Sequence, residues 1–154
     1  MDYKGPPKMT KQEIYDFITE MKIARICTKN KDGSIHSIPV WYLVDGENII
    51  VFTPETSQKA KNIRRNRKLS ILIDNQDLQS KGVIIYGESD EGVVATEEEA
   101  LTLFRRYMDE DHAQKYMKGS QKLATWIKFT IKPYKFASFD YHKDEVYRKA
   151  MSGE

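Results

Sequence analysis

Two glycine-containing turns constrain the fold of this chain, because each joins two short strand-like segments. The first turn, at 30–33, separates expected strands at 24–29 and 35–44, and the second, at 45–48, leads into an expected strand at 49–53. Turns this short connect antiparallel neighbours, since a parallel pair needs a crossover of a dozen or more residues. The segment is therefore expected to form antiparallel hairpins, with Pro39 favouring a bulged or edge position for the second strand.

The rest of the chain adds strands and a few helices. Further strands are expected at 69–74, at 82–94 with a bend at Gly87 and Gly92, and at 126–132 and 134–141 on either side of Pro133. Helices are expected from Thr10 to Met21, from Ser57, from Thr96 to Tyr107, and over 112–118 with an end at Gly119. Six or seven strands joined mainly by hairpins predict a mainly β antiparallel barrel with α additions.

The expected organisation is one domain with two short appendages. Residues 1–9 carry Gly5-Pro6-Pro7 and are expected to form a flexible arm. Residues 10–142 form the domain, and the charged tail 143–154 is expected to be helical or frayed.

Composition favours a soluble globular protein, with 40% hydrophobic and 31% charged residues. No apolar run reaches the roughly 20 residues of a membrane-spanning helix, and segment 1–10 lacks the apolar core of a signal peptide. Cys27 is the only cysteine, which excludes an intrachain disulfide and favours the cytoplasm. The net charge of +2 is too small to indicate a membrane or nucleic acid partner by itself.

Positive charge is concentrated in one segment. Between Lys59 and Lys68 there are six basic residues and no acidic ones. Just before this segment, Ser57 stands at an expected helix N-terminus. Unpaired amides and the helix dipole favour a phosphate at such a position. The same residues also fit a plain helix cap with a solvated basic face, and the residues alone leave both interpretations open.

No conventional catalytic set is evident, and catalytic residues are not assigned. The three histidines His36, His112 and His142 are scattered and lack metal-ligand spacing, so no metal is expected. The lack of acid–base and nucleophilic groups favours chemistry carried by a cofactor. Trp41 and Tyr42 are expected on opposite faces of their strand, with one in the core and the other free to flank a pocket.

Around Trp41 and Tyr42 and in the basic segment that follows, the chain resembles the pyridoxamine 5′-phosphate oxidase-like superfamily of FMN-binding split β-barrels. The resemblance extends over residues 10–141 and is densest from Ala24 to Asp74. It is carried by ARICT, KDGSIHSIPVWY, VFT, VIIYGE and above all SQKAKNIRRNRKLSILID.

The resemblance implies a homodimeric split β-barrel with FMN at the subunit interface. The partner subunit would help to cover the ring with side chains from 82–87 or 136–141. The implied contacts along the isoalloxazine are made by Ser37, Ile38, Pro39, Val40, Trp41 and Tyr42. Those near the ribityl chain are made by Phe52 and Thr53. Those around the phosphate are made by Ser57, Gln58, Lys59 and Lys61.

The implied activity is an FMN-dependent oxidoreductase that moves hydride between the flavin and a small molecule. Pyridoxamine phosphate oxidases often carry Arg where Gln58 stands and have a C-terminal extension that this sequence does not show, so vitamin B6 oxidation is disfavoured. One alternative is an F420-dependent reductase whose acidic cofactor tail lies on the 64–67 surface. Others are a non-catalytic flavin or haem carrier and, less favoured, a nucleic-acid binder using 59–68.

Overall fold

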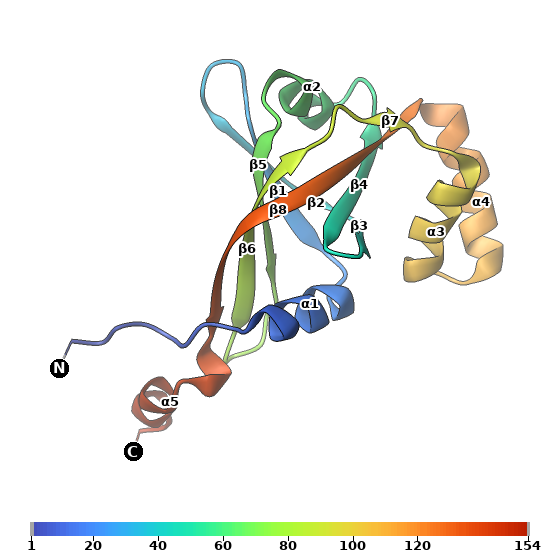
Figure 1. Ribbon diagram of the computed structural model, residues 1–154. Helices are drawn as coiled ribbons and strands as arrows, with labels where there is room; N and C mark the ends of the chain where they lie inside the picture. The colour runs from blue at the N-terminus through green and yellow to red at the C-terminus, as the bar shows by residue number, and fades with distance from the viewer. Residues whose placement is uncertain (1, 154) are drawn as a thin grey trace.

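A single curled antiparallel sheet organises the chain, whose computed structural model describes residues 2–153 (Figure 1). Its strands are β1 (Ala24–Lys29), β2 (Ile35–Val40), β3 (Tyr42–Asp45), β4 (Asn48–Pro54), β5 (Lys68–Asp74), β6 (Lys81–Ser89), β7 (Val93–Val94) and β8 (Trp126–Asp140). The helices are α1 (Lys11–Glu20), α2 (Gln58–Arg65), α3 (Glu97–Tyr107), α4 (Glu110–Leu123) and α5 (Glu145–Ser152), with a 3-10 turn η1 (Tyr141–Lys143) before the last. No helix within residues 2–153 is long and apolar enough to cross a membrane.

The order of strands explains the curl. The sheet runs β2-β1-β5-β6-β8-β4-β3, with β7 also paired to β8, and every pairing is antiparallel. The two edge strands, β2 and β3, are consecutive in the chain and separated only by Trp41. The sheet must therefore bend until its two edges meet, and the predicted antiparallel split barrel is confirmed.

The prediction of one strand over 35–44 was wrong, because the chain changes partner at Trp41. Residues up to Val40 pair with β1, whereas Tyr42 pairs with Val51 of β4. A single straight strand cannot pair with both ends of the sheet, so it breaks where the barrel splits. The edge position predicted from Pro39 is confirmed, since β2 is an outer strand.

The two strands predicted around Pro133 form one strand, β8. The register between β6 and β8 shifts between Tyr86 and Gly87, so that Tyr86 pairs with Lys135 and Gly87 with Pro133. Tyr134 is the extra residue of this bulge. A bulge leaves part of the ladder unpaired and so accommodates a residue that lacks an N–H group.

Two other predicted boundaries need correction. The strand predicted over 82–94 divides, since β6 ends at Ser89 and Gly92, with φ +81°, turns the chain into β7. The helix predicted over 112–118 extends through α4 to Leu123, and Gly119 lies inside it. Glycine ends a helix only where the backbone takes the left-handed conformation, and Gly119 does not. The predicted helices at 10–21 and 96–107, with their capping boxes at Thr10 and Thr96, are confirmed.

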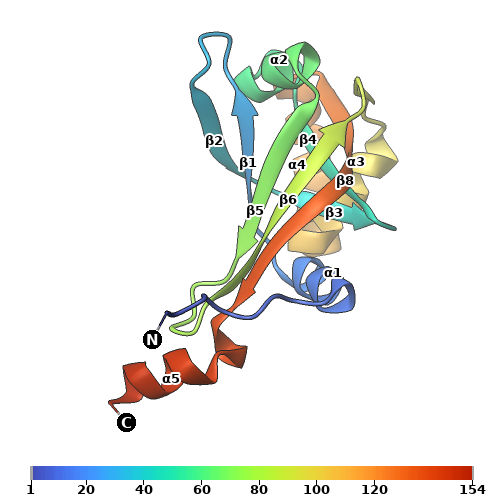
Figure 2. The ribbon, with the colours of Figure 1, turned by 60° about the vertical axis from the view of Figure 1, so that its left-hand side comes forward.

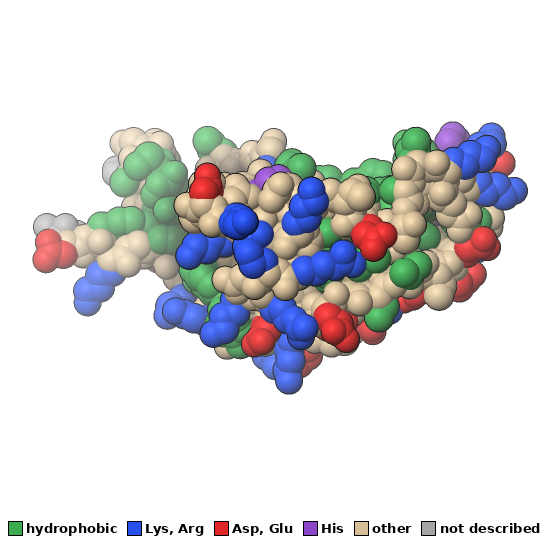
Figure 3. Space-filling view, turned by 90° about the horizontal axis from the view of Figure 1, so that it is seen from above, with side chains coloured by type: hydrophobic (Ala, Val, Ile, Leu, Met, Phe, Trp, Pro, Cys, Tyr) green, Lys and Arg blue, Asp and Glu red, His purple; other side chains and the backbone are tan. Residues whose placement is uncertain are grey.

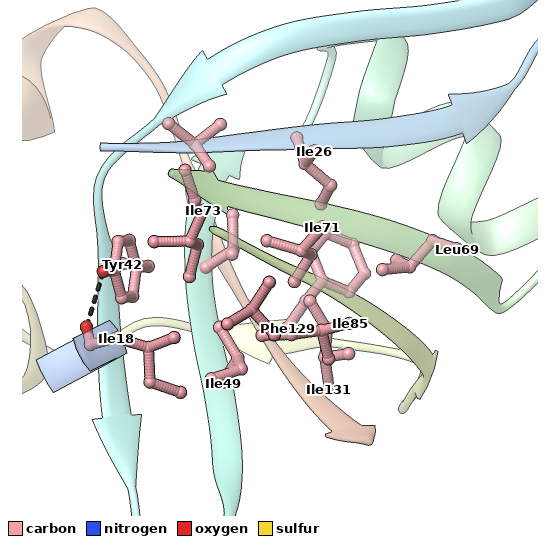
Figure 4. Close-up of a cluster of buried hydrophobic side chains, with 14 of the residues drawn as sticks. Ile18, Ile26, Tyr42, Ile49, Leu69, Ile71, Ile73, Ile85, Phe129 and Ile131 are labelled. Carbon is pink, nitrogen blue, oxygen red and sulfur yellow. Dashed lines mark hydrogen bonds between the residues drawn. The ribbon is translucent and has the colours of Figure 1, made fainter. Parts of the chain in front are cut away.

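The barrel encloses the main hydrophobic core (Figure 4). Alternate residues of β5, β6 and β8 point inward, as the period of two in a strand requires. The largest fully buried side chains include Tyr42, Phe129, Ile18, Ile26, Ile49, Ile71, Ile85 and Ile131. The hairpin of α3 and α4 has its own small buried cluster, formed by Leu101, Ala113 and Met117.

Both termini lie at the same end of the molecule (Figures 1 and 2). In the N-terminal segment Met9 is buried, and its N–H donates to Ser138 Oγ at 2.9 Å. The N–H of Asp140 donates to the carbonyl of Pro7 at 3.0 Å. Residues 145–152 form α5, which confirms the helical alternative for the tail, while the predicted domain boundaries stay predictions.

Replacing Gly87 by alanine is expected to lower the free energy of unfolding by roughly 1–3 kcal/mol, the usual cost of overpacking. A Cβ at Gly87 would lie 2.5 Å from Ile131 Cγ2 and 3.3 Å from the carbonyl oxygen of Lys132. The control is Gly119→Ala, where a Cβ meets nothing within 4 Å and helix propensity predicts a gain of up to about 1 kcal/mol. Urea unfolding measures both, and wild-type stability of Gly87→Ala would contradict the packing argument.

Candidate functional site

A cavity of about 700 Å³ lies between one end of the barrel and the α3–α4 hairpin. This volume is within the range of small-molecule sites, about 300–1,000 Å³. The barrel wall consists of Pro39, Val40, Trp41, Phe52, Pro54, Lys59 and Trp126. The helical wall consists of Ala100, Leu103, Phe104, Lys115, Tyr116, Gly119, Ser120 and Leu123.

The barrel wall follows from the alternation of side chains along β4. Val51 and Thr53 are buried in the barrel, so Phe52 between them points to the other side of the strand, into the cavity. The break between β2 and β3 has the same effect, since Tyr42 is fully buried while Trp41 lines the cavity. This confirms the prediction that the two aromatic residues have different surroundings.

The helical wall follows from the spacing of residues on α3 and α4. Ala100, Leu103 and Phe104 have the i, i+3, i+4 spacing that places side chains on one face of a helix, and Tyr116, Gly119, Ser120 and Leu123 extend this to i+7. None of these residues is among those that the sequence predicts for the site. Their helical spacing forms an apolar stripe that could have indicated them, but such a stripe does not distinguish a face packed against a core from a face that borders a cavity.

An aromatic cluster joins the two walls. The Trp41 indole stacks on the Tyr107 ring, with centroids 4.4 Å apart and an interplanar angle of 11°. Phe104 meets Trp41 edge to face at 6.3 Å and lies 5.7 Å from Tyr116. Such arrangements are the favoured geometries of aromatic pairs. They fix the orientation of Trp41 in the cavity.

Arg106 binds the helical hairpin to the barrel. Its guanidinium donates to the carbonyl of Tyr42 at 2.8 Å, to the carbonyl of Thr19 at 3.0 Å and also to that of Met21. The carbonyls of Thr19 and Met21 belong to the C-terminal end of α1, whose last turn contains no basic residue. Arg106 therefore supplies the positive charge that a helix C-terminus favours, and it does so from a different helix.

The Tyr107 hydroxyl completes this connection. It accepts from the N–H of Tyr42 at 3.1 Å and from Arg106 at 2.8 Å, and it donates to the carbonyl of Lys22 at 2.6 Å. Burial raises the pKa of Tyr107, which keeps the hydroxyl protonated and able to donate. Together the two side chains satisfy both backbone polar groups of Tyr42 at the split in the sheet.

Lys59 is a half-buried cation at the start of α2. Burial lowers the pKa of its ammonium group, and no ion pair to Lys59 is present among residues 2–153. Ser57 caps the helix, accepting from the N–H of Ala60 at 3.2 Å, and its hydroxyl is 2.7 Å from Thr53 Oγ1. The α2 geometry leaves the amides of Gln58 and Lys59 without intrahelical acceptors. A half-buried cation, helix amides and the Ser57 hydroxyl are groups that can bind a phosphate.

The cavity brings together part of the predicted set. Five of those residues line it, namely Pro39, Val40, Trp41, Phe52 and Lys59. Seven lie outside its lining, namely Ser37, Ile38, Tyr42, Thr53, Ser57, Gln58 and Lys61. Ser37 is exposed on β2, the Tyr42 side chain is in the core, and Lys61 points to solvent. Gln58 donates to the side chain of Asn62 at 2.9 Å. Their roles toward a cofactor stay predictions.

The basic residues of α2 and its surroundings gather at one end of the molecule (Figure 3). Arg65 donates to the carbonyl of Lys29 and to Asn62, so part of this charge is used within the protein. Arg64 and Arg67 are exposed, and Arg67 lies 3.8 Å from Glu91. The surface next to the α2 end of the cavity is therefore positive.

Comparisons with known proteins agree with this architecture. The family model described as pyridoxamine 5′-phosphate oxidase matches residues 10–135. A conserved hypothetical protein from Mycobacterium tuberculosis is 25% identical with a TM-score of 0.76, covering 93% of this chain and 91% of its own. No curated protein matches.

Two more distant structures share the fold alone. An F420 reductase is 20% identical with a TM-score of 0.68, covering 83% of this chain and 98% of its own. An FAD-binding protein from Mesorhizobium loti is 17% identical with a TM-score of 0.62, covering 87% of this chain and 95% of its own.

Arg106→Ala is expected to lower the free energy of unfolding by roughly 1.5–3 kcal/mol, the scale of hydrogen bonds to a charged group. It should also shift tryptophan emission to the red, because Trp41 loses its ordered contact with Tyr107. The neighbouring Arg105→Ala is the control, since Arg105 pairs only with exposed Glu98 and Glu110 and such pairs contribute little. Equal behaviour of the two variants in urea unfolding and emission spectra would contradict the role given to Arg106.

Proposed function

This chain belongs to the pyridoxamine 5′-phosphate oxidase family, and on that premise we propose that it binds FMN and transfers hydride between the flavin and a small molecule. The observation that carries the proposal is Lys59, a half-buried cation without an ion-pair partner among the described residues, in the lining of an apolar cavity. Burying a charge is costly unless an opposite charge is supplied. A phosphate monoester would supply it.

The residues around Lys59 fit the phosphate end of FMN. Lys59 provides the charge, the amides at the start of α2 provide N–H donors, and Ser57 provides a hydroxyl that the buried Thr53 hydroxyl holds at 2.7 Å. Gln58 stands where many pyridoxamine phosphate oxidases carry arginine, so Lys59 would bear most of the charge compensation. Lys61, exposed on the same helix, would add only long-range attraction.

The ring of the flavin would lie along the β2 edge. An edge strand presents N–H and C=O groups that have no partner within the sheet, and within residues 2–153 β2 pairs with β1 alone. Such groups can bond to the polar edge of the isoalloxazine, which supplies the two-electron chemistry. Within residues 2–153 no carboxylate or imidazole lines the cavity. The protein would therefore bind, orient and desolvate the reactants, and we assign no catalytic acid or base.

A homodimer would complete the site. The outer face of β5, β6 and β8 faces the viewer in Figure 2, with α3 and α4 behind it. This face carries partly exposed apolar side chains, namely Leu72, Ile84, Tyr86, Ala137 and Phe139. Apolar sheet faces of this kind mark association surfaces. The segments 82–87 and 136–141, which we expect the partner subunit to place over the ring, lie side by side on it.

F420 is a second candidate cofactor, and the exposed arginines Arg64 and Arg67 favour it because they could bind an acidic tail. Haem is less favoured, since none of the three histidines lines the cavity. The absorption spectrum of the purified protein separates flavin, F420 and haem. Bleaching of a bound flavin by NAD(P)H then separates a reductase from a carrier.

Lys59→Ala is expected to weaken FMN binding at least tenfold, about 1.4 kcal/mol, by removing a charge-assisted hydrogen bond to the phosphate. Quenching of flavin fluorescence on titration measures the affinity. Lys118→Ala, which removes the same charge from the exposed side of α4, is the control and should bind as wild type does.

The same titration across pH gives a second readout. An anion bound to Lys59 raises the pKa of the ammonium group in the complex, so the contribution of Lys59 to affinity is fully present below the pKa of free Lys59 and is lost as pH rises from that value through the higher pKa of the complex. Burial places that pKa below the usual 10.5. As pH rises into the alkaline range, the FMN affinity of wild type should therefore fall more steeply than that of Lys59→Ala. Equal affinities and parallel pH profiles would overturn the phosphate assignment.

The dimer proposal predicts that wild type sediments at twice the chain mass of 18.0 kDa. Ile84→Asp, on the outer face of β6, should shift the protein toward monomer and weaken FMN. Val146→Asp on α5 introduces the same charge at another exposed apolar residue and should stay dimeric. Sedimentation velocity decides between these outcomes, and a dimeric Ile84→Asp protein would place the interface elsewhere.

A further inference from the structure

We infer that the half of the cavity walled by α3 and α4 binds a planar, uncharged aromatic molecule, which would be the substrate that meets the flavin. Only the statement that this molecule is the substrate that meets the flavin rests on the proposed function. The chemical class of the ligand follows from the cavity itself.

The lining excludes strongly polar ligands. Lys59 and Lys115 are the only charged residues in its lining, and Lys59 is assigned to the phosphate. The Lys115 ammonium is exposed and lies 2.9 Å from Asp111 Oδ2, so it keeps its hydration and its nearest counter-ion on the surface of α4. A charged ligand in this half would lose hydration without gaining a partner, which is unfavourable.

The polar atoms of the aromatic lining are also partly used. Trp126 donates its indole N–H to the carbonyl of Ser120 at 2.9 Å, which leaves its ring as apolar surface. Phe104 lies 6.3 Å from Trp41 in an edge-to-face arrangement, and Trp41 is held by its stack on Tyr107. Fixed rings on both walls favour a flat aromatic ligand, since aromatic rings stack offset or meet edge to face.

Two exposed residues on the α4 side of the cavity also favour a bound apolar ligand. Tyr116 and Leu123 are 52% and 84% exposed, although both point along the face of α4 that lines the cavity. Apolar side chains left exposed beside an apolar cavity extend the surface that a ligand can cover. A planar aromatic ligand would cover them and complete the enclosure on the α4 side.

The chain provides its own reporter for this ligand. It contains two tryptophans, Trp41 and Trp126, and both line the cavity. Intrinsic tryptophan fluorescence therefore arises entirely from residues that line the cavity. The uncharged quencher 1-nitronaphthalene is a suitable probe, and 5-nitronaphthalene-1-sulfonate is its charged match.

The experiment titrates each probe into the full-length protein, with and without FMN. We expect saturable quenching by 1-nitronaphthalene and at least tenfold weaker binding of the sulfonate. Tyr116→Ser should weaken 1-nitronaphthalene at least fivefold while FMN affinity stays within twofold. Tyr134→Ser is the matched control, since Tyr134 is similarly exposed, at 57%, but does not line the cavity. It should bind the probe as wild type does.

Three results would overturn the inference: equal binding of the two probes, an unchanged affinity in Tyr116→Ser, or competition between 1-nitronaphthalene and FMN. Competition would mean that the flavin itself fills the aromatic half. If FMN does not bind but the probe binds with the expected selectivity, the ligand class is supported and the flavin proposal fails. The two hypotheses are thus tested separately.

Discussion

The covalent continuity of the chain through Trp41 is the constraint on which the rest of the structure depends. It joins β2 and β3, the two edges of the sheet, through one residue, so the sheet has to curl. At the junction Tyr42 lies opposite Val51 of β4, and its own backbone N–H and C=O bond to Tyr107 and Arg106. Buried backbone groups rarely stay unpaired. The split in the barrel therefore determines where α3 attaches.

This mode of attachment explains how the cavity persists. The barrel core and the α3–α4 cluster are separate hydrophobic clusters. The hairpin is held to the barrel by a guanidinium, a hydroxyl and an aromatic stack rather than by a shared core. Directional contacts fix position without filling the space between the elements. A large apolar cavity can therefore remain between two well-packed units.

The two ends of the cavity suit different chemistry. At α2, a desolvated ammonium and helix amides favour an anion, whereas the α3–α4 side offers aromatic rings and aliphatic side chains. A cofactor that carries its own redox chemistry needs from the protein an anchor, an orientation and a dry environment. This division of labour is consistent with a lining, among residues 2–153, that contains no carboxylate or imidazole.

The sequence by itself determined the features that depend on neighbouring residues: the hairpin turns, the capped helices, the edge position of Pro39 and the cation at the start of α2. Only the tertiary structure decided the break at Trp41, the continuity of β8 through a bulge at Pro133, and the length of α4 beyond Gly119. It also decided that Phe104, Tyr116 and Trp126 face the same cavity as Trp41. These features depend on which distant strand or helix a residue meets, and local periodicity is the same whether an apolar face packs against a core or borders a cavity.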